Sequence, residues 1–134
     1  MFNSIALVGG THGNETSGIQ LIRNWQQFGL PSRFNELNVS LSIANEAAIA
    51  ANVRFVDEDL NRQFTFERLS NNNSAKEAEL AKALNQQLGP KGDSNTDFVI
   101  DIHNTTSEMG ATLIILEADE FHIQPVSYTH LTLP

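Results

Sequence analysis

Residues 4–15 read SIALVGGTHGNE, a short apolar run that ends in two glycines and is followed by His12 and Glu15. An apolar run of this length that stops at a Gly-Gly pair is typical of a buried strand entering a tight turn. The turn places His12 at the carboxyl end of the strand, the edge at which open α/β sheets bind their ligands. This stretch predicts a strand with candidate functional residues at its end.

Strands and helices alternate along the rest of the chain. Helices are expected from about residue 16 to Gly29 and over 45–53 and 75–88, and strands over 37–44, 97–103 and 111–117. Ser74 and Glu77 fit a capping box at the start of the last helix. Such alternation predicts a layered α/β fold with a mostly parallel sheet.

Composition narrows the class of function. The chain has 134 residues, 40% of them hydrophobic, and a net charge of −8, which suits one globular domain and argues against a nucleic-acid or anionic-membrane partner. There is no cysteine, so a zinc site here must use His and carboxylate ligands. The N-terminus lacks a basic n-region and no apolar run approaches the ~20 residues of a membrane span, so a cytoplasmic protein is expected.

His12 and Glu15 form an H-x-x-E pair. Three residues apart in a turn or first helical turn, the two side chains can point the same way and supply two of the three protein ligands of a catalytic zinc. The competing interpretation is a polar turn residue followed by a glutamate that favours the helix N-terminus. A phosphate loop is disfavoured, because neither a P-loop lysine nor the Rossmann glycine pattern is present.

The segment DIHNTTS (101–107) offers a second group. Asp101 and His103 are two residues apart and project from the same face of the expected strand. If His103 is a metal ligand, Asp101 can orient its imidazole. The alternative is a hydrogen-bonded histidine at a strand end, with Asn104 and Thr105 capping the turn.

The segment RFVDEDLNRQF (54–64) is neither cleanly helical nor cleanly β. It contains Arg54, Asn61 and Arg62, and guanidinium groups are the usual clamp for a carboxylate. The alternative is a solvated charged loop held by its own ion pairs, since residues 57–59 are all acidic.

Taken together, GGTHGNE (9–15), RFVDEDLNRQF (54–64) and DIHNTTSEMGATLI (101–114) resemble the aspartoacylase family, within a wider group that includes succinylglutamate desuccinylases and zinc carboxypeptidases. The likeness extends over roughly residues 4–124. It implies a three-layer α/β/α zinc-carboxypeptidase-like fold, of which this chain holds the N-terminal part.

The resemblance also implies roles for individual residues. His12, Glu15 and His103 match the zinc ligands of the family, with one zinc per chain, and Arg54 matches the arginine that polarises the scissile carbonyl. Asn61 and Arg62 match residues that bind the substrate carboxylate, and Asn104 lies in the matching pocket turn. The implied reaction is hydrolysis of an N-acyl amino acid, foremost N-acetyl-L-aspartate. Acetylated aromatic amino acids or succinylated glutamate are the alternative substrates, and a non-catalytic zinc- or ligand-binding domain is the alternative class.

Part of the family pattern has no counterpart here. The family uses a later glutamate as general base and has a C-terminal β-rich domain, and neither Glu117, Asp119 nor Glu120 sits in the base motif. The chain is therefore expected to be very slow or inactive by itself. Residues 125–134 do not resemble the family and are interpreted as not native to this fold, with a genuine irregular tail as the alternative. Homo-oligomer formation is left open.

Overall fold

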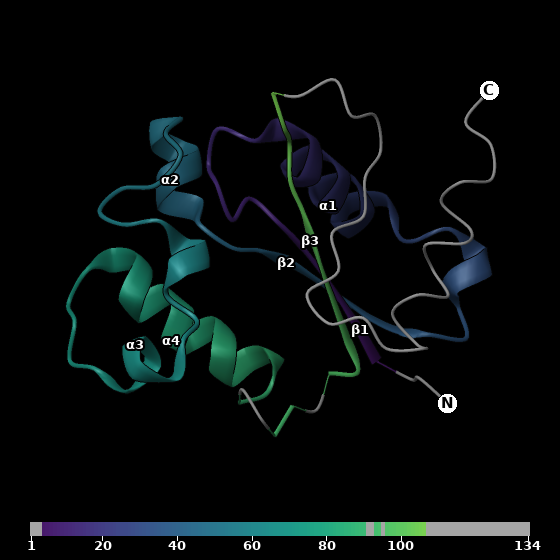
Figure 1. Cartoon of the computed structure of the whole chain (residues 1–134). Coiled ribbons are helices and arrows are strands. Elements are labelled where there is room, and N and C mark those ends of the chain that lie inside the picture. The colour runs from purple at the N-terminus through teal and green to yellow at the C-terminus, as the bar shows by residue number, and fades with distance from the viewer. Residues whose placement is uncertain (1–3, 91–92, 95, 107–134) are drawn as a thin grey trace. The chain divides into compact units, whose positions relative to one another are not determined.

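A computed structural model describes residues 4–90, 93–94 and 96–106 of the chain (Figure 1). The chain divides into two units after Asn104, and the helices and strands that follow all belong to the first. The expected strand at 111–117 and the segment 125–134 lie outside the described residues.

The sheet has three parallel strands, β1 (Ser4–Gly9), β2 (Asn38–Ile43) and β3 (Phe98–Ile102), in the order β2-β1-β3. They confirm the strands expected at 4–9, 37–44 and 97–103. In the register, Gly9 pairs with Ile102. Parallel strands end at the same edge, so the residues that follow β1 and β3 lie beside each other there.

Helix α1 (Thr16–Phe28) packs on one face of this sheet through the buried residues Ile19 and Ile22. Its first turn approaches the strand ends closely at Gly18, where a Cβ atom would lie 2.6 Å from the carbonyl oxygen of Ile102. Real Cβ atoms do not come so near a backbone oxygen, and only glycine fits. The close approach sets the N-terminus of α1 directly against the carboxyl ends of β1 and β3.

The other face of the sheet carries the hydrophobic core, made by Val8, Ala44, Leu60, Ala81 and Leu84. Figure 1 shows α1 on one side of the strands and α4 (Lys76–Leu88) on the other, the layering expected from the sequence. The remaining helical elements are η1 (Ser32–Phe34), α2 (Glu46–Ala51), η2 (Leu60–Arg62) and α3 (Phe66–Ser70). Among the described residues, no helix has the length and apolarity that crossing a bilayer requires.

The expected capping box at the start of α4 is wrong. The N-cap residue is Ala75, and no side chain caps the helix from that position. The Glu77 carboxylate is fully buried and accepts hydrogen bonds from the backbone N–H groups of residues 56–58. The first N–H of the helix donates to Asp57. The Glu77 carboxylate therefore binds N–H groups of a distant segment instead of the N–H at the start of its own helix. A four-residue motif cannot reveal such a competing partner.

The buried carboxylate makes the fold sensitive to acid. Burial raises the pKa of Glu77, but hydrogen bonds from Val56, Asn45, Glu58 and Asp57 outweigh it and lower the pKa from 4.5 to about 2. A group whose pKa is depressed on folding contributes stability that is complete above its unfolded value and lost as the pH falls toward its folded value. Between pH 5 and pH 2 we expect this group alone to reduce the free energy of unfolding by about 3 kcal/mol. Urea titrations of the wild type and Glu77→Gln across that range measure the free energy of unfolding. The variant should lack this part of its pH dependence. An equal pH dependence in the two proteins would contradict the low pKa of Glu77.

Candidate metal centre

His12 and Glu15 lie in the loop between β1 and α1, and both are buried, with 2% and 9% of their surface exposed. Nδ1 of His12 is 2.7 Å from Oε1 of Glu15. Glu15 is the N-cap residue of α1, yet its side chain makes no capping hydrogen bond to that helix. The carboxylate is directed at the imidazole instead, which argues against the interpretation of this pair as a turn residue and a helix-favouring acid.

His103 directly follows β3 and meets the same carboxylate from the other side. Its Nδ1 is 2.9 Å from Oε2 of Glu15, and the ring centroids of His12 and His103 are 5.0 Å apart. One ligand atom from each of the three residues lies within 4.8 Å of the others. Within the described part of the chain, this is a group whose donors can share a metal ion.

Each imidazole is also held by a second carboxylate at its other nitrogen. Nε2 of His12 is 3.1 Å from Oδ1 of Asp59, and Nε2 of His103 is 2.7 Å from Oδ2 of Asp101. Asp101 in turn accepts a 2.8 Å hydrogen bond from the Thr11 hydroxyl. The expected contact between Asp101 and His103 is therefore present. Both rings are turned so that Nδ1 faces Glu15, and carboxylates in the position of Asp59 and Asp101 fix the tautomer of a metal-binding histidine.

The charges of the cluster follow from these contacts. The Asp101 carboxylate, assisted by Glu15 and opposed by burial, raises the pKa of His103 to about 9. For Glu15, burial raises the pKa, but hydrogen bonds from the Asn104 N–H and from both histidines outweigh it and lower the pKa below its usual value. The pKa of Asp59 is lowered in the same way, chiefly by its hydrogen bond to His12 acting against burial. The carboxylates are thus anionic at neutral pH, as metal ligands and their supports must be.

Arg54 borders this cluster. Its guanidinium donates to Oε1 of Glu15 at 3.3 Å and to Oδ2 of Asp59 at 3.5 Å, and the side chain is 52% exposed. The structure thus brings Arg54 to the predicted ligands, with part of its fork turned to solvent. That placement suits a group that meets a substrate oxygen beside a metal.

Asn61 and Arg62 lie on η2, two and three residues after Asp59. The buried Leu60 anchors this turn in the core, and the N–H of Asn61 donates to Oδ1 of Asp59 at 3.0 Å. Both side chains are exposed, and no described residue gives the Arg62 side chain a hydrogen bond or an ion pair. The turn is fixed to the cluster through its backbone while its polar side chains stay open to solvent.

Asn104 is built into the cluster in a different way from the one expected. Its N–H donates to Oε2 of Glu15 at 2.8 Å, its side-chain oxygen accepts from the N–H of Ser17, and its amide nitrogen donates to the Ser17 hydroxyl. These bonds join the end of β3 to the first turn of α1. In this structure Asn104 orients the Glu15 carboxylate; whether it also lines a substrate pocket stays a prediction.

Asp59 is the residue that reading the sequence missed. The three acids at 57–59 favoured ion pairs within their own loop, and Asp59 does pair with Arg54, but each acid also contacts a different element. Asp59 reaches His12, Glu58 pairs with Arg68, and Asp57 accepts from α4. The available signal was the position of Asp59 immediately before the L-N-R turn. Two further acids directly precede Asp59, however, and the sequence alone does not show which of the three contacts a histidine.

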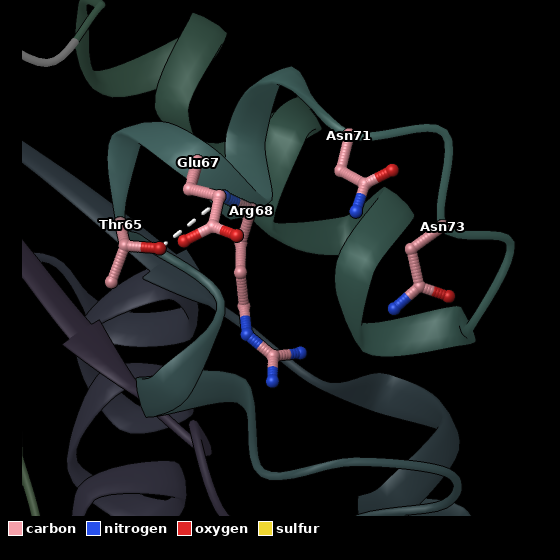
Figure 2. A pocket seen from close by; sticks show the side chains of 5 residues that line it. All are labelled: Thr65, Glu67, Arg68, Asn71 and Asn73. Atoms are coloured by element: carbon pink, nitrogen blue, oxygen red, sulfur yellow. Dashed lines mark hydrogen bonds between the residues drawn. The ribbon is translucent and has the colours of Figure 1, made fainter.

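A separate polar hollow of about 370 Å³ lies over α3 and the loop after it, lined by Thr65, Glu67, Arg68, Asn71 and Asn73 (Figure 2). Arg68 is already engaged there, because its guanidinium donates to Oε2 of Glu58 at 2.9 Å. None of the candidate metal ligands lines this hollow.

Comparison with known families matches residues 2–131 to the succinylglutamate desuccinylase/aspartoacylase catalytic domain. A probable aspartoacylase of Trichodesmium erythraeum is 42% identical over 128 residues, covering 94% of this chain and 43% of that protein. An N-acyl-aromatic-L-amino acid amidohydrolase (carboxylate-forming) of Xenopus laevis is 39% identical over 129 residues, covering 94% of this chain and 42% of that protein.

Among solved structures, murine aminoacylase 3 superimposes with a TM-score of 0.70 at 40% identity, over 79% of this chain and 36% of that one. The likeness supports the layered α/β fold deduced from the strand and helix pattern. The chain spans about two-fifths of the length of the relatives whose sequences it matches.

Proposed function

Because the chain belongs to the family of succinylglutamate desuccinylase and aspartoacylase catalytic domains, we propose that it is part of a zinc-dependent amidohydrolase that cleaves N-acetyl-L-aspartate to aspartate and acetate. The observation that carries the proposal is the convergence of His12 and His103 on the single carboxylate of Glu15.

The hydrogen-bond inventory of this cluster fits a cation. Both nitrogens of both rings face carboxylate oxygens, and an ionised carboxylate can only accept. Without a metal, the hydrogen bonds of His103 to Glu15 and Asp101 favour its doubly protonated form. A cation held by His12, Glu15 and His103 would supply the positive charge that these carboxylates attract, while Asp59 and Asp101 keep the rings oriented. One ligand atom from each of the three residues lies within 4.8 Å of the others, so the set is already gathered around one point.

When bound, zinc supplies Lewis acidity that acidifies a water molecule and polarises an acyl oxygen. The residues of the chain do the rest. His12, Glu15 and His103 hold the metal, and Asp59 and Asp101 keep the imidazoles in register. Arg54, half exposed beside Glu15, donates to the oxygen that gains negative charge as water attacks the acyl carbon. Asn61 and Arg62 bind the carboxylate of the substrate, and Asn104 lies at the edge of the same pocket.

Attack by water also needs a general base. Among the described carboxylates, Glu15, Asp59 and Asp101 are committed to the histidines. The family resemblance places the base later in the polypeptide, and we carry the role onto none of Glu117, Asp119 and Glu120. That residues 1–124 form an N-terminal part of such a catalytic domain is part of this proposal.

Two other functions are compatible with the same centre. The Xenopus relative is named for acylated aromatic amino acids, and succinylated glutamate is the substrate named for another branch of the family. A zinc-binding domain without catalysis would also use these ligands.

Elemental analysis and substrate binding test the proposal together. The purified chain should hold one zinc per molecule, and the zinc-loaded chain should bind N-acetyl-L-aspartate in preference to N-acetylphenylalanine and N-succinylglutamate. Zinc without any of these ligands would favour the binding domain. A folded chain that takes up no stoichiometric zinc would reject every catalytic alternative.

Arg62→Ala should weaken the binding of N-acetyl-L-aspartate by about 10- to 100-fold, the value of one charge-assisted hydrogen-bonding pair. Zinc affinity should be unchanged, because the Arg62 side chain makes no hydrogen bond or ion pair with any described residue. Calorimetric titration of the zinc-loaded chain measures both affinities. Arg23→Ala is the matched control, since Arg23 is an exposed arginine paired with Glu46 on the surface. Equal substrate affinity in the two variants would remove Arg62 from the carboxylate clamp.

A further inference from the structure

Glu77 is the most completely buried acid among the described residues, with 0% of its surface exposed, and nothing in the reaction uses it. It lies in the first turn of α4 and meets four donors. Oε1 accepts from the Asn45 side-chain amide at 3.0 Å and from the N–H of Val56 at 2.6 Å. Oε2 accepts from the N–H groups of Asp57 and Glu58 at 3.0 and 3.1 Å.

The stoichiometry of this contact requires a carboxylate. Four donors occupy two oxygens, which matches the acceptor capacity of an ionised carboxyl group. A glutamine in the same place offers one oxygen and turns an NH₂ group toward N–H donors. It leaves two of the four donors unpaired inside the protein, where an unmatched polar group is costly. The pocket is therefore built around a negative charge.

The contact is reciprocal. While Glu77 binds the backbone of residues 56–58, Asp57 accepts the N–H of Lys76 at the start of α4 at 2.9 Å. Asn45 extends the link toward the metal loop, because its own N–H donates to the carbonyl of Gly10 at 3.0 Å. The β1–α1 loop, the segment 54–62 and α4 are thereby joined through one buried carboxylate.

The bound stretch 56–58 lies between the two ends of the segment that reach the metal centre. On one side is Arg54, which donates to Glu15, and on the other is Asp59, which holds His12. Asn61 and Arg62 follow on the next turn. Fixing three consecutive backbone amides between these groups sets the path of the chain, and so the distance and direction at which the side chains meet a ligand.

We propose that Glu77 is a positioning residue of the proposed reaction: its carboxylate fixes the segment 54–62 so that Arg54, Asn61 and Arg62 face the substrate beside the metal. The inference rests on the proposed function for the identity of the substrate. The contact between Glu77 and the backbone of residues 56–58 is independent of it. The zinc ligands themselves lie outside this segment, and of their supports only Asp59 belongs to it.

The test compares Glu77→Gln with Glu79→Gln, the same chemical change at an exposed glutamate two residues further along the same helix. In Glu77→Gln, amide hydrogen exchange at residues 56–58 should speed up at least about tenfold, and the NMR signals of Asn61 and Arg62 should move. At saturating zinc, the affinity of the chain for N-acetyl-L-aspartate should fall about tenfold, while the stoichiometry stays at one zinc per chain. Glu79→Gln should change none of these.

A Glu77→Gln chain that melts earlier but binds zinc and N-acetyl-L-aspartate like the wild type would overturn the inference, because the residue would then be only structural. A wild-type chain that takes up zinc but not N-acetyl-L-aspartate would reject the proposed substrate instead. In that case the NMR signals of Asn61 and Arg62 test the role of Glu77. Signals that shift between the wild type and Glu77→Gln support the positioning role, and unchanged signals reject it. If Glu77→Gln does not fold, couplings across the hydrogen bonds from the amides of Val56 and Glu58 to the Glu77 carboxyl carbon, measured on the wild type, take its place. Their absence, with unprotected amides, rejects the inference.

Discussion

His103→Ala is expected to reduce the zinc affinity of the chain by more than about 100-fold, since removing a residue that only supports a ligand already costs 10- to 100-fold. A catalytic zinc has three protein ligands, and without the imidazole only His12 and Glu15 remain from the described cluster. The fold should survive the change. The His103 side chain is 32% exposed and outside the hydrophobic core, so the loss is confined to its hydrogen bonds with Glu15 and Asp101.

A competition titration with a chromophoric chelator measures the affinity, and thermal melting of the metal-free chain checks the fold. Asp101→Asn supplies a graded comparison, because it keeps every ligand and removes the charge of the group that orients His103 and accepts from Thr11. Its zinc affinity should fall by about 10- to 100-fold, between the wild type and His103→Ala. A folded His103→Ala chain that binds zinc as tightly as the wild type would exclude this residue as a ligand.

The strand β1 was predictable as a short apolar run with a turn signal at its end, and β2 as a run of alternating apolar and polar residues; the sheet has strands at both places and at the segment 97–103. The meeting of His12 and His103 could also be foreseen, since both follow strands and parallel strands end at one edge. Their spacing along the chain is 91 residues, so no local pattern joins them. The family resemblance gave them a common role before the structure placed them together, and that role is still a proposal.

Residues that serve the centre through contacts with distant segments could not be identified in this way. Asp59 and Glu77 are ordinary acids in acidic stretches, and their partners are 47 and about 20 residues away. The capping box predicted for Glu77 failed for the same reason, because the motif describes only the nearest donors. Helix α3 was also missed: it has five residues and none of them is buried, so no apolar periodicity marks it.

Gly13→Ala is expected to destabilise the chain by at least about 3 kcal/mol, the upper part of the usual range for overpacking. A Cβ at this position would overlap the backbone of α2, at the carbonyl of Ala48 and the nitrogen of Ile49. Backbone atoms inside a hydrogen-bonded helix cannot rotate away as a flexible side chain can, so the β1–α1 loop and α2 must separate. For a chain of this size the melting temperature should fall on the order of 10 °C.

The damage should also reach the metal centre, because the Gly13 N–H donates to the carbonyl of Arg54 at 3.2 Å, and Gly13 directly follows His12. Moving the loop draws His12 away from Asp59, so zinc affinity should fall together with stability. Gly29→Ala is the matched control: its Cβ meets nothing within 4 Å, and the only penalty is its backbone conformation of φ +84° and ψ 161°, worth about 1–3 kcal/mol. Melting curves and zinc titrations of both variants separate steric overlap from loss of glycine flexibility. A Gly13→Ala chain no less stable than Gly29→Ala would mean that the loop does not pack against α2 as closely as the structure has it.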